Sequence, residues 1–378
     1  MFKDLHIKDY DFKLIFLVIA INVIGILAIG SANPAVQTRQ IIGAVFGFFL
    51  MIVVSLIDYT IFLKFYWIWY ILDLGLLLAV KLAGTSAGGA ARWFMIAGIR
   101  FQPSETAKIL LIIFFAQFIM KYREKINSVK FLISYFVLMA VPLGLIYSQP
   151  DLSTTIVTAF VLLVLLFVSG LDWKIILGAI AVVIPSFIVF ISIILKEGQS
   201  LISDYQRNRI LSFFYPEKFV DDAYQQTNSV IAIGSGQLLG KGLNNNVISS
   251  LKNGNYIIEP ETDFIFAVIG EELGFAGALA VILLLFFIVY ECLFIARRSK
   301  DIAGRVIGVG LATLIGIQTF FNIGVATFLL PNTGLTLPFV SYGLTSLVSL
   351  YIGLGFVINV RFRTGIKRER KEKEGFIS

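Results

Sequence analysis

The chain has 378 residues, of which 58% are hydrophobic and only 15% are charged, and its formal net charge at pH 7 is +7. A soluble domain averages about 25% charged residues, and the mean hydropathy here is +0.88. The apolar residues form unbroken runs about as long as a bilayer is thick. This pattern excludes a soluble globular protein and indicates a polytopic membrane protein.

Ten apolar runs qualify as candidate transmembrane helices. In chain order they are 13–31, 41–57, 62–82, 107–120, 131–148, 152–170, 174–195, 264–296, 303–329 and 341–360. The run 264–296 has an early polar interruption. The predicted fold class is therefore all-α, a polytopic integral membrane protein of about ten transmembrane helices. We expect residues 1–360 to form one transmembrane domain and 361–378 to form a basic cytoplasmic tail.

The distribution of basic residues predicts the orientation of the chain. With a cytoplasmic N-terminus, the inner segments hold 20 of the 31 Lys and Arg residues and the outer segments hold 11. The positive-inside rule therefore predicts that both termini are cytoplasmic. The tail is expected to be disordered and attracted to anionic lipid, and it could be either an ordinary stop-transfer flank or a partner site.

Two outer connections are longer than a structural turn needs. Residues 83–106 are rich in glycine, arginine and aromatic residues, and residues 197–262 form the large extracytoplasmic loop between spans seven and eight. Loops of this length are usually functional or disordered. The apolar stretches of the second loop favour order at the membrane surface.

Charged residues within apolar spans are costly and therefore suggest function. Asp73 is expected to pair with Lys81 between helices, and Glu291 is expected to pair with Arg297 or to extend to the interface. These pairings are the structural alternative to a functional role for each residue.

The only histidine is His6, near the N-terminus, and the only cysteine is Cys292, inside an apolar run. An intrachain disulfide is excluded. A histidine-dependent nucleophile and the usual His/Cys zinc site are both disfavoured. We expect no haem and no zinc, so the chemistry must use carboxylates, Lys or Arg, hydroxyls, backbone groups or an oxygen-bound metal.

The segment 259–263 carries three acidic residues directly before the eighth span. Asp263 lies where a helix begins, and the helix dipole favours a carboxylate there. The cluster could hold a divalent cation through oxygen ligands. One member could also deprotonate a substrate hydroxyl, since nearby negative charge raises a carboxyl pKa. A plain N-cap is the alternative.

The glycine-rich run 234–242 imitates a phosphate-binding loop. It fails the dinucleotide fingerprint at Leu239 and fails the Walker A pattern at Ser235 and Gly242. We expect no nucleotide cofactor, although backbone N–H groups of this loop could meet a pyrophosphate. The residues alone fit either an enzyme acting on a lipid-linked substrate or a transporter.

The run from Thr262 to Gly274 resembles the signature of the SEDS family of bacterial peptidoglycan polymerases, the FtsW/RodA/SpoVE type. Three more blocks agree with this family in order and spacing, namely 92–108, 149–152 and 322–343. The chain departs from the family pattern at Leu344, Thr345 and Phe328, none of which coincides with the acidic segment.

The resemblance implies an inverting glycosyltransferase that polymerises lipid II at the outer face of the bacterial plasma membrane, for cell elongation or division, and releases undecaprenyl pyrophosphate. It implies a class B penicillin-binding protein as partner, and no nucleic acid. A lipid II flippase or transporter, or a non-catalytic scaffold of a cell-wall synthesis complex, is the alternative.

The resemblance also assigns roles to residues. It places the essential acid on Asp263, which would deprotonate the acceptor 4-hydroxyl or orient it through a bound Mg²⁺ or Mn²⁺. The candidate substrate-binding residues are Arg92, Trp93, Glu105, Lys108, Gln149, Asp151, Glu271, Ser341 and Tyr342. Within this set Glu105 and Lys108 share a helical face, so a simple in-helix ion pair is the alternative for them.

Overall fold

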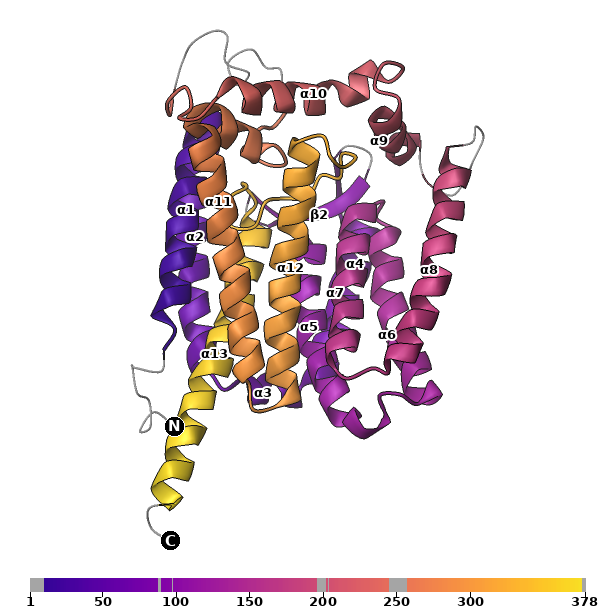
Figure 1. Ribbon diagram of the computed structural model, residues 1–378, viewed down its shortest axis with the longest axis vertical. Helices are drawn as coiled ribbons and strands as arrows, with labels where there is room; N and C mark the ends of the chain where they lie inside the picture. The colour runs from indigo at the N-terminus through magenta and orange to yellow at the C-terminus, as the bar shows by residue number, and fades with distance from the viewer. Residues whose placement is uncertain are drawn as a thin grey trace.

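The computed structural model describes residues 10–87, 90–96, 98–195, 202, 204–244 and 257–375, with most of their side chains up to Arg363. His6 lies outside these residues. Long helices form a bundle, and two helices of the large loop lie across one end of it (Figure 1). Helix α1 begins and α13 ends at the opposite end.

Each of the ten predicted spans coincides with one long helix of the bundle. These helices are α1 (Phe12–Ala32), α2 (Pro34–Leu56), α4 (Tyr66–Ala83), α5 (Pro103–Lys121), α6 (Val129–Tyr147), α7 (Leu152–Val168), α8 (Trp173–Ile194), α11 (Ile265–Arg298), α12 (Ile302–Ala326) and α13 (Leu344–Gly375). Within the described part of the chain, eight helices are long and apolar enough to cross a membrane, and α7 is a shorter apolar helix. The predicted fold class is confirmed.

Short polar residues fix where several helices begin. Their side-chain oxygens accept a hydrogen bond from a backbone N–H of the first turn, which otherwise has no partner inside the helix. The capping residues are Asp11 for α1, Asn33 for α2, Asp58 for the short α3 (Tyr59–Lys64), Asp151 for α7, Asp172 for α8 and Asp301 for α12. Five aspartates of the chain therefore have a structural role as N-caps.

Both predicted ion pairs of the spans are wrong. Asp73 is buried and neither of its carboxylate oxygens has a hydrogen-bond partner, whereas Lys81 is exposed. Eight residues span about 12 Å along a helix, which separates the two groups. Glu291 accepts hydrogen bonds from Lys13 at 2.7 Å and Arg361 at 3.1 Å, because α1 and α13 pack against this part of α11.

The C-terminal tail is helical, against the predicted disorder. Helix α13 continues from the last span through Gly375. The segment after Arg361 consists largely of Lys, Arg and Glu, which are good helix formers, so nothing in its composition ends the helix at the membrane surface.

The first outer connection contains a small sheet that the sequence did not predict. Strands β1 (Thr85–Ala87), β2 (Ala90–Ile96) and β3 (Ile99–Phe101) form a three-stranded antiparallel sheet in the order β1-β2-β3. Strand β2 lies at the same end of the bundle as the large loop (Figure 1).

The large loop contains α9 (Asp204–Phe214) and α10 (Val220–Ser235), so its described part is ordered as predicted. Residues 236–242, the glycine loop, follow α10 and pack against a kink in α11 at Gly274, where φ is 66° and ψ is −164°. The N–H groups of Lys241 and Gly242 donate to the carbonyls of Glu271 and Glu272, at 3.0 and 2.9 Å.

The glycine loop also accepts hydrogen bonds from the far side of the kink. The carbonyls of Gln237 and Leu238 accept from the N–H groups of Phe275 and Ala276, at 2.8 and 3.1 Å. A kink breaks helical hydrogen bonds, and in a membrane protein the freed groups must find partners in the chain. The glycine-rich run is therefore a structural element that completes α11.

The glycines of this loop permit the close backbone approach. A Cβ at Gly236 would lie 1.9 Å from the carbonyl oxygen of Gly270, whereas one at Gly234, two residues earlier, would meet nothing within 4 Å. We expect Gly236→Ala to destabilise the protein by about 1–3 kcal/mol, since overpacking forces the backbone apart. Gly234→Ala, the matched control, is expected to unfold at the wild-type temperature or slightly above it. Equal unfolding temperatures for the two purified variants would contradict this packing.

Candidate active site

Asp263 lies in the turn directly before α11, at the end of the bundle that carries the sheet and the large loop. Its carbonyl accepts a hydrogen bond from Asn322 Nδ2 at 2.8 Å, and the carbonyl of Thr262 accepts one from Ser341 Oγ at 2.6 Å. Helix α12 and the segment before α13 therefore both hold the backbone of this turn.

The side chain of Asp263 is not an N-cap. The N-cap of α11 is Phe264, which makes no side-chain hydrogen bond to the helix. The carboxylate is partly buried and its backbone is fixed by other segments. This arrangement leaves the carboxylate available for chemistry.

Charged groups from three other segments surround the Asp263 carboxylate. Burial raises its pKa to about 6; the positive charges of Arg209 on α9 and Arg92 on β2 oppose this shift, and the negative charges of Glu259 and Asp151 reinforce it. A carboxyl group with this pKa is mostly ionised at neutral pH, yet it is a stronger base than an ordinary aspartate. It can therefore accept a proton from a substrate hydroxyl.

Arg92 is anchored to the turn between α6 and α7. Its Nε donates to the carbonyl of Gln149 at 3.0 Å and its Nη2 donates to the carbonyl of Pro150. The amide of Gln149 in turn donates to the carbonyl of Leu77 at 3.1 Å, and Asp151 caps α7. Three predicted site residues, Arg92, Gln149 and Asp151, thus form one connected unit beside Asp263.

The acidic segment does not act as one cluster. Glu261 is buried and its Oε1 accepts a hydrogen bond from Asn33 Nδ2 at 2.7 Å, so it points to the start of α2. In the part of the chain that the structure describes, no three His, Cys, Asp or Glu side chains come together as metal ligands. The predicted binding of Mg²⁺ or Mn²⁺ at Asp263 stays a prediction.

Three other predicted residues, Glu105, Lys108 and Glu271, form ion pairs of their own. Glu105 and Lys108 form a buried ion pair of 2.7 Å at the start of α5. Glu271 pairs with Lys241 of the glycine loop, also at 2.7 Å, and thereby supports the kink. Trp93 lies on β2, half-buried, next to Arg92 in sequence.

Ser341 and Tyr342 act on the Asp263 turn through its backbone. Ser341 Oγ donates to Thr262, as described, and accepts from the N–H of Leu337 at 2.7 Å. The N–H of Tyr342 donates to the carbonyl of Glu261 at 2.8 Å. These contacts also explain why α13 begins at Leu344 rather than at 341.

Two residues of the site were not predicted. Arg209 contributes the strongest charge interaction with Asp263, and Gly334 lies against both side chains. The only sequence signal for Arg209 was its position, since a basic residue on the outer side runs against the positive-inside trend. Gly334 carried no comparable signal.

The fold and the site together define a polytopic helical membrane protein with a carboxylate flanked by two arginines at one end of the bundle. The family described as "Cell cycle protein", FtsW/RodA/SpoVE, matches residues 10–365. The chain belongs to this family, as the sequence resemblance predicted.

Similar proteins match over nearly the whole chain. The probable peptidoglycan glycosyltransferase FtsW of Geobacter metallireducens is 34% identical over 379 residues, covering 95% of this chain and 96% of that protein. The peptidoglycan glycosyltransferase MrdB of Escherichia coli is 36% identical over 355 residues and covers 93% of both.

Solved structures agree with the fold. A chain from a structure of a peptidoglycan synthase complex, described as coordinating polymerization and crosslinking, superposes with a TM-score of 0.76 at 29% identity and covers 94% of this chain and 98% of that one. RodA of Thermus thermophilus superposes with a TM-score of 0.67 at 28% identity, covering 93% and 96%.

Proposed function

We propose that the chain is a peptidoglycan glycosyltransferase that polymerises lipid II at the outer face of the bacterial plasma membrane. Relatives named as peptidoglycan glycosyltransferases match 93–95% of the chain. The observation that carries the assignment of the site is the Asp263 carboxylate, which has a raised pKa and lies beside Arg92 and Arg209.

The chemistry of glycosyl transfer fits this arrangement. The acceptor hydroxyl oxygen attacks the anomeric carbon of the donor sugar, and the bond from that carbon to the pyrophosphate oxygen breaks. The pyrophosphate leaves with the bonding electron pair, and the hydroxyl proton passes to Asp263. Attack opposite the leaving group inverts the configuration. The guanidinium of Arg92, fixed by two backbone carbonyls, stabilises developing negative charge nearby.

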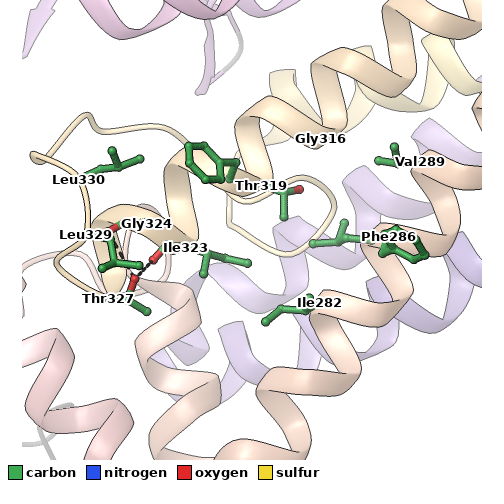
Figure 2. Close-up of a pocket in the computed structure, with 12 residues that line it drawn as sticks. Ile282, Phe286, Val289, Gly316, Thr319, Ile323, Gly324, Thr327, Leu329 and Leu330 are labelled. Atoms are coloured by element: carbon green, nitrogen blue, oxygen red, sulfur yellow. Dashed lines mark hydrogen bonds between the residues drawn. The ribbon is translucent and has the colours of Figure 1, made fainter.

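The partner of the proposed enzyme is a class B penicillin-binding protein. A structure that superposes on this chain comes from a complex that couples polymerization to crosslinking. Helices α11 and α12 form an apolar groove of about 430 Å³ (Figure 2), whose lining includes Gly316, Thr319 and Gly324. Small residues let a second helix approach closely in a membrane. We assign this groove to a transmembrane helix of the partner.

Both termini are proposed to be cytoplasmic. Helix α1 begins and α13 ends at one end of the bundle, and α9, α10 and β2 lie at the other (Figure 1). The basic segments 121–130 and 297–305 connect helices on the side of the termini, as the positive-inside rule requires. Asp263 then faces the outside.

Purified protein in lipid nanodiscs, supplied with labelled lipid II, tests the function. We expect glycan chains from the enzyme alone and cross-linked chains when the penicillin-binding partner is added. Parallel reactions with Mg²⁺, with Mn²⁺ and without either cation measure whether the activity depends on a metal. A transporter in liposomes would move lipid II across the bilayer without polymer. A scaffold would give neither product and would change only the activity of its partner. Either of these results would contradict the proposal.

A further inference from the structure

The space between Asp263 and Arg209 is kept open by a glycine. Gly334 lies in the segment between α12 and α13 with a φ of +71°, a conformation that other residues rarely adopt. A Cβ placed there would lie 3.3 Å from Asp263 Oδ2 and 3.4 Å from Arg209 Nη1. The carboxylate and the guanidinium therefore flank the same small volume.

Helix α9 is tied to the unit that holds Arg92. Gln206 Nε2 donates to the carbonyl of Pro150 at 3.3 Å, the same carbonyl that accepts from Arg92. Phe213 packs edge-on against Phe328, at a centroid distance of 5.9 Å, in the segment that leads to Gly334. These contacts tie the helix that carries Arg209 to the turn that holds Arg92 and to the segment before Gly334.

We propose that Arg209 is a further catalytic residue, which binds the pyrophosphate leaving group together with Arg92, and that Gly334 preserves the gap in which the reacting groups lie. This inference rests on the proposed glycosyltransferase function. A pyrophosphate carries several negative charges and presents oxygens that guanidinium groups bind well, and the Arg209 guanidinium flanks the same small volume as the Asp263 carboxylate.

In the proposed reaction, Arg209 acts on the bond that breaks. As the bond from the anomeric carbon to the pyrophosphate oxygen lengthens, its electron pair moves onto that oxygen. The fixed positive charges of Arg209 and Arg92 stabilise this oxygen while Asp263 takes the hydroxyl proton. The base and the leaving-group site are thus separated only by the gap at Gly334.

The first test compares Arg209→Gln with Arg207→Gln. Arg207 lies on the same helix, but its Nε donates to the carbonyl of Ile194 at 3.2 Å. We expect Arg209→Gln to lower kcat by about 10²–10³-fold, as removal of one transition-state donor does, with partial recovery in Arg209→Lys. Arg207→Gln is expected to keep wild-type kcat.

A pH profile separates this role from a structural one. The charged groups that face Asp263 are Arg209, Arg92, Glu259 and Asp151. Loss of the Arg209 charge removes a contribution that lowers the pKa of Asp263, so the acid limb of kcat/KM should move to higher pH in Arg209→Gln. Wild-type kcat and an unmoved limb in this variant would overturn the inference. Absence of polymer from the wild-type enzyme would instead overturn the proposed function.

The second test adds a methyl group to the gap. Gly334→Ala is compared with Gly170→Ala, which has a similar left-handed backbone, with a φ of +99°, and open space around the added Cβ. We expect similar losses of stability in both variants and a loss of polymerisation of at least tenfold only in Gly334→Ala. Equal activity of the two folded variants would overturn the role of Gly334.

Discussion

Asp263→Asn is expected to lose polymerisation of lipid II while keeping the fold. Asparagine has the shape of aspartate but accepts no proton, and general-base assistance contributes about 10²–10⁴-fold to a rate. The backbone carbonyl that Asn322 binds is unchanged by the substitution. The initial rate of glycan formation by the purified variant measures the effect, and its thermal unfolding shows that the protein is intact.

Asp172→Asn is a matched control for this substitution. Asp172 is the exposed N-cap of α8, and asparagine caps a helix as well as aspartate does. We therefore expect wild-type rates from it. Near-normal glycan synthesis by folded Asp263→Asn would remove the proposed base from the mechanism.

Lys108→Met is expected to cause the largest loss of stability. The ammonium of Lys108 and the carboxylate of Glu105 are 2.7 Å apart, and the two side chains are only 2% and 10% exposed. Removing one partner of a buried pair leaves the other charge unpaired and costs about 3–5 kcal/mol. Denaturant or thermal unfolding of the purified protein measures this loss.

Two further variants identify the origin of that loss. The double variant Glu105→Gln with Lys108→Met removes both charges and is expected to recover most of the stability. Lys13→Met is the control. Lys13 pairs with Glu291 and its side chain is 60% exposed, and the Glu291 carboxylate keeps Arg361 as a partner after the substitution. The loss of stability is therefore expected to stay below about 1 kcal/mol. If Lys108→Met were as stable as the wild type, the pair would have no structural role and the substrate-binding prediction would be favoured.

The transmembrane helices could be predicted because a span depends on a continuous run of apolar residues, which is a property of one segment. The kink at Gly274 could not, because its broken hydrogen bonds are satisfied by residues 236–242. The glycine-rich run resembled a phosphate-binding loop because packing against another backbone and binding a phosphate both require glycines, whose backbone other groups can approach closely. The sheet 85–101 also depends on pairing between short strands that carry little pattern.

The site was predictable to a similar degree. Asp263 stood out because it is acidic and opens a span. Its charge partner Arg209 lies on a separate helix of the large loop, and only the folded chain brings the two together. The predicted pair of Asp73 and Lys81 failed for a related reason, since residue spacing along one helix does not show which neighbour each side chain faces.

The pH dependence of glycan formation tests most directly that the Asp263 carboxylate drives the transfer. The pKa of this group is raised to about 6 by burial, and only the ionised form accepts a proton. Because kcat/KM reports the pKa values of the free enzyme, wild-type kcat/KM for lipid II, measured from pH 5 to 8, should be constant above about pH 7 and fall tenfold per pH unit well below 6. A rate that is independent of pH across this range would contradict the account.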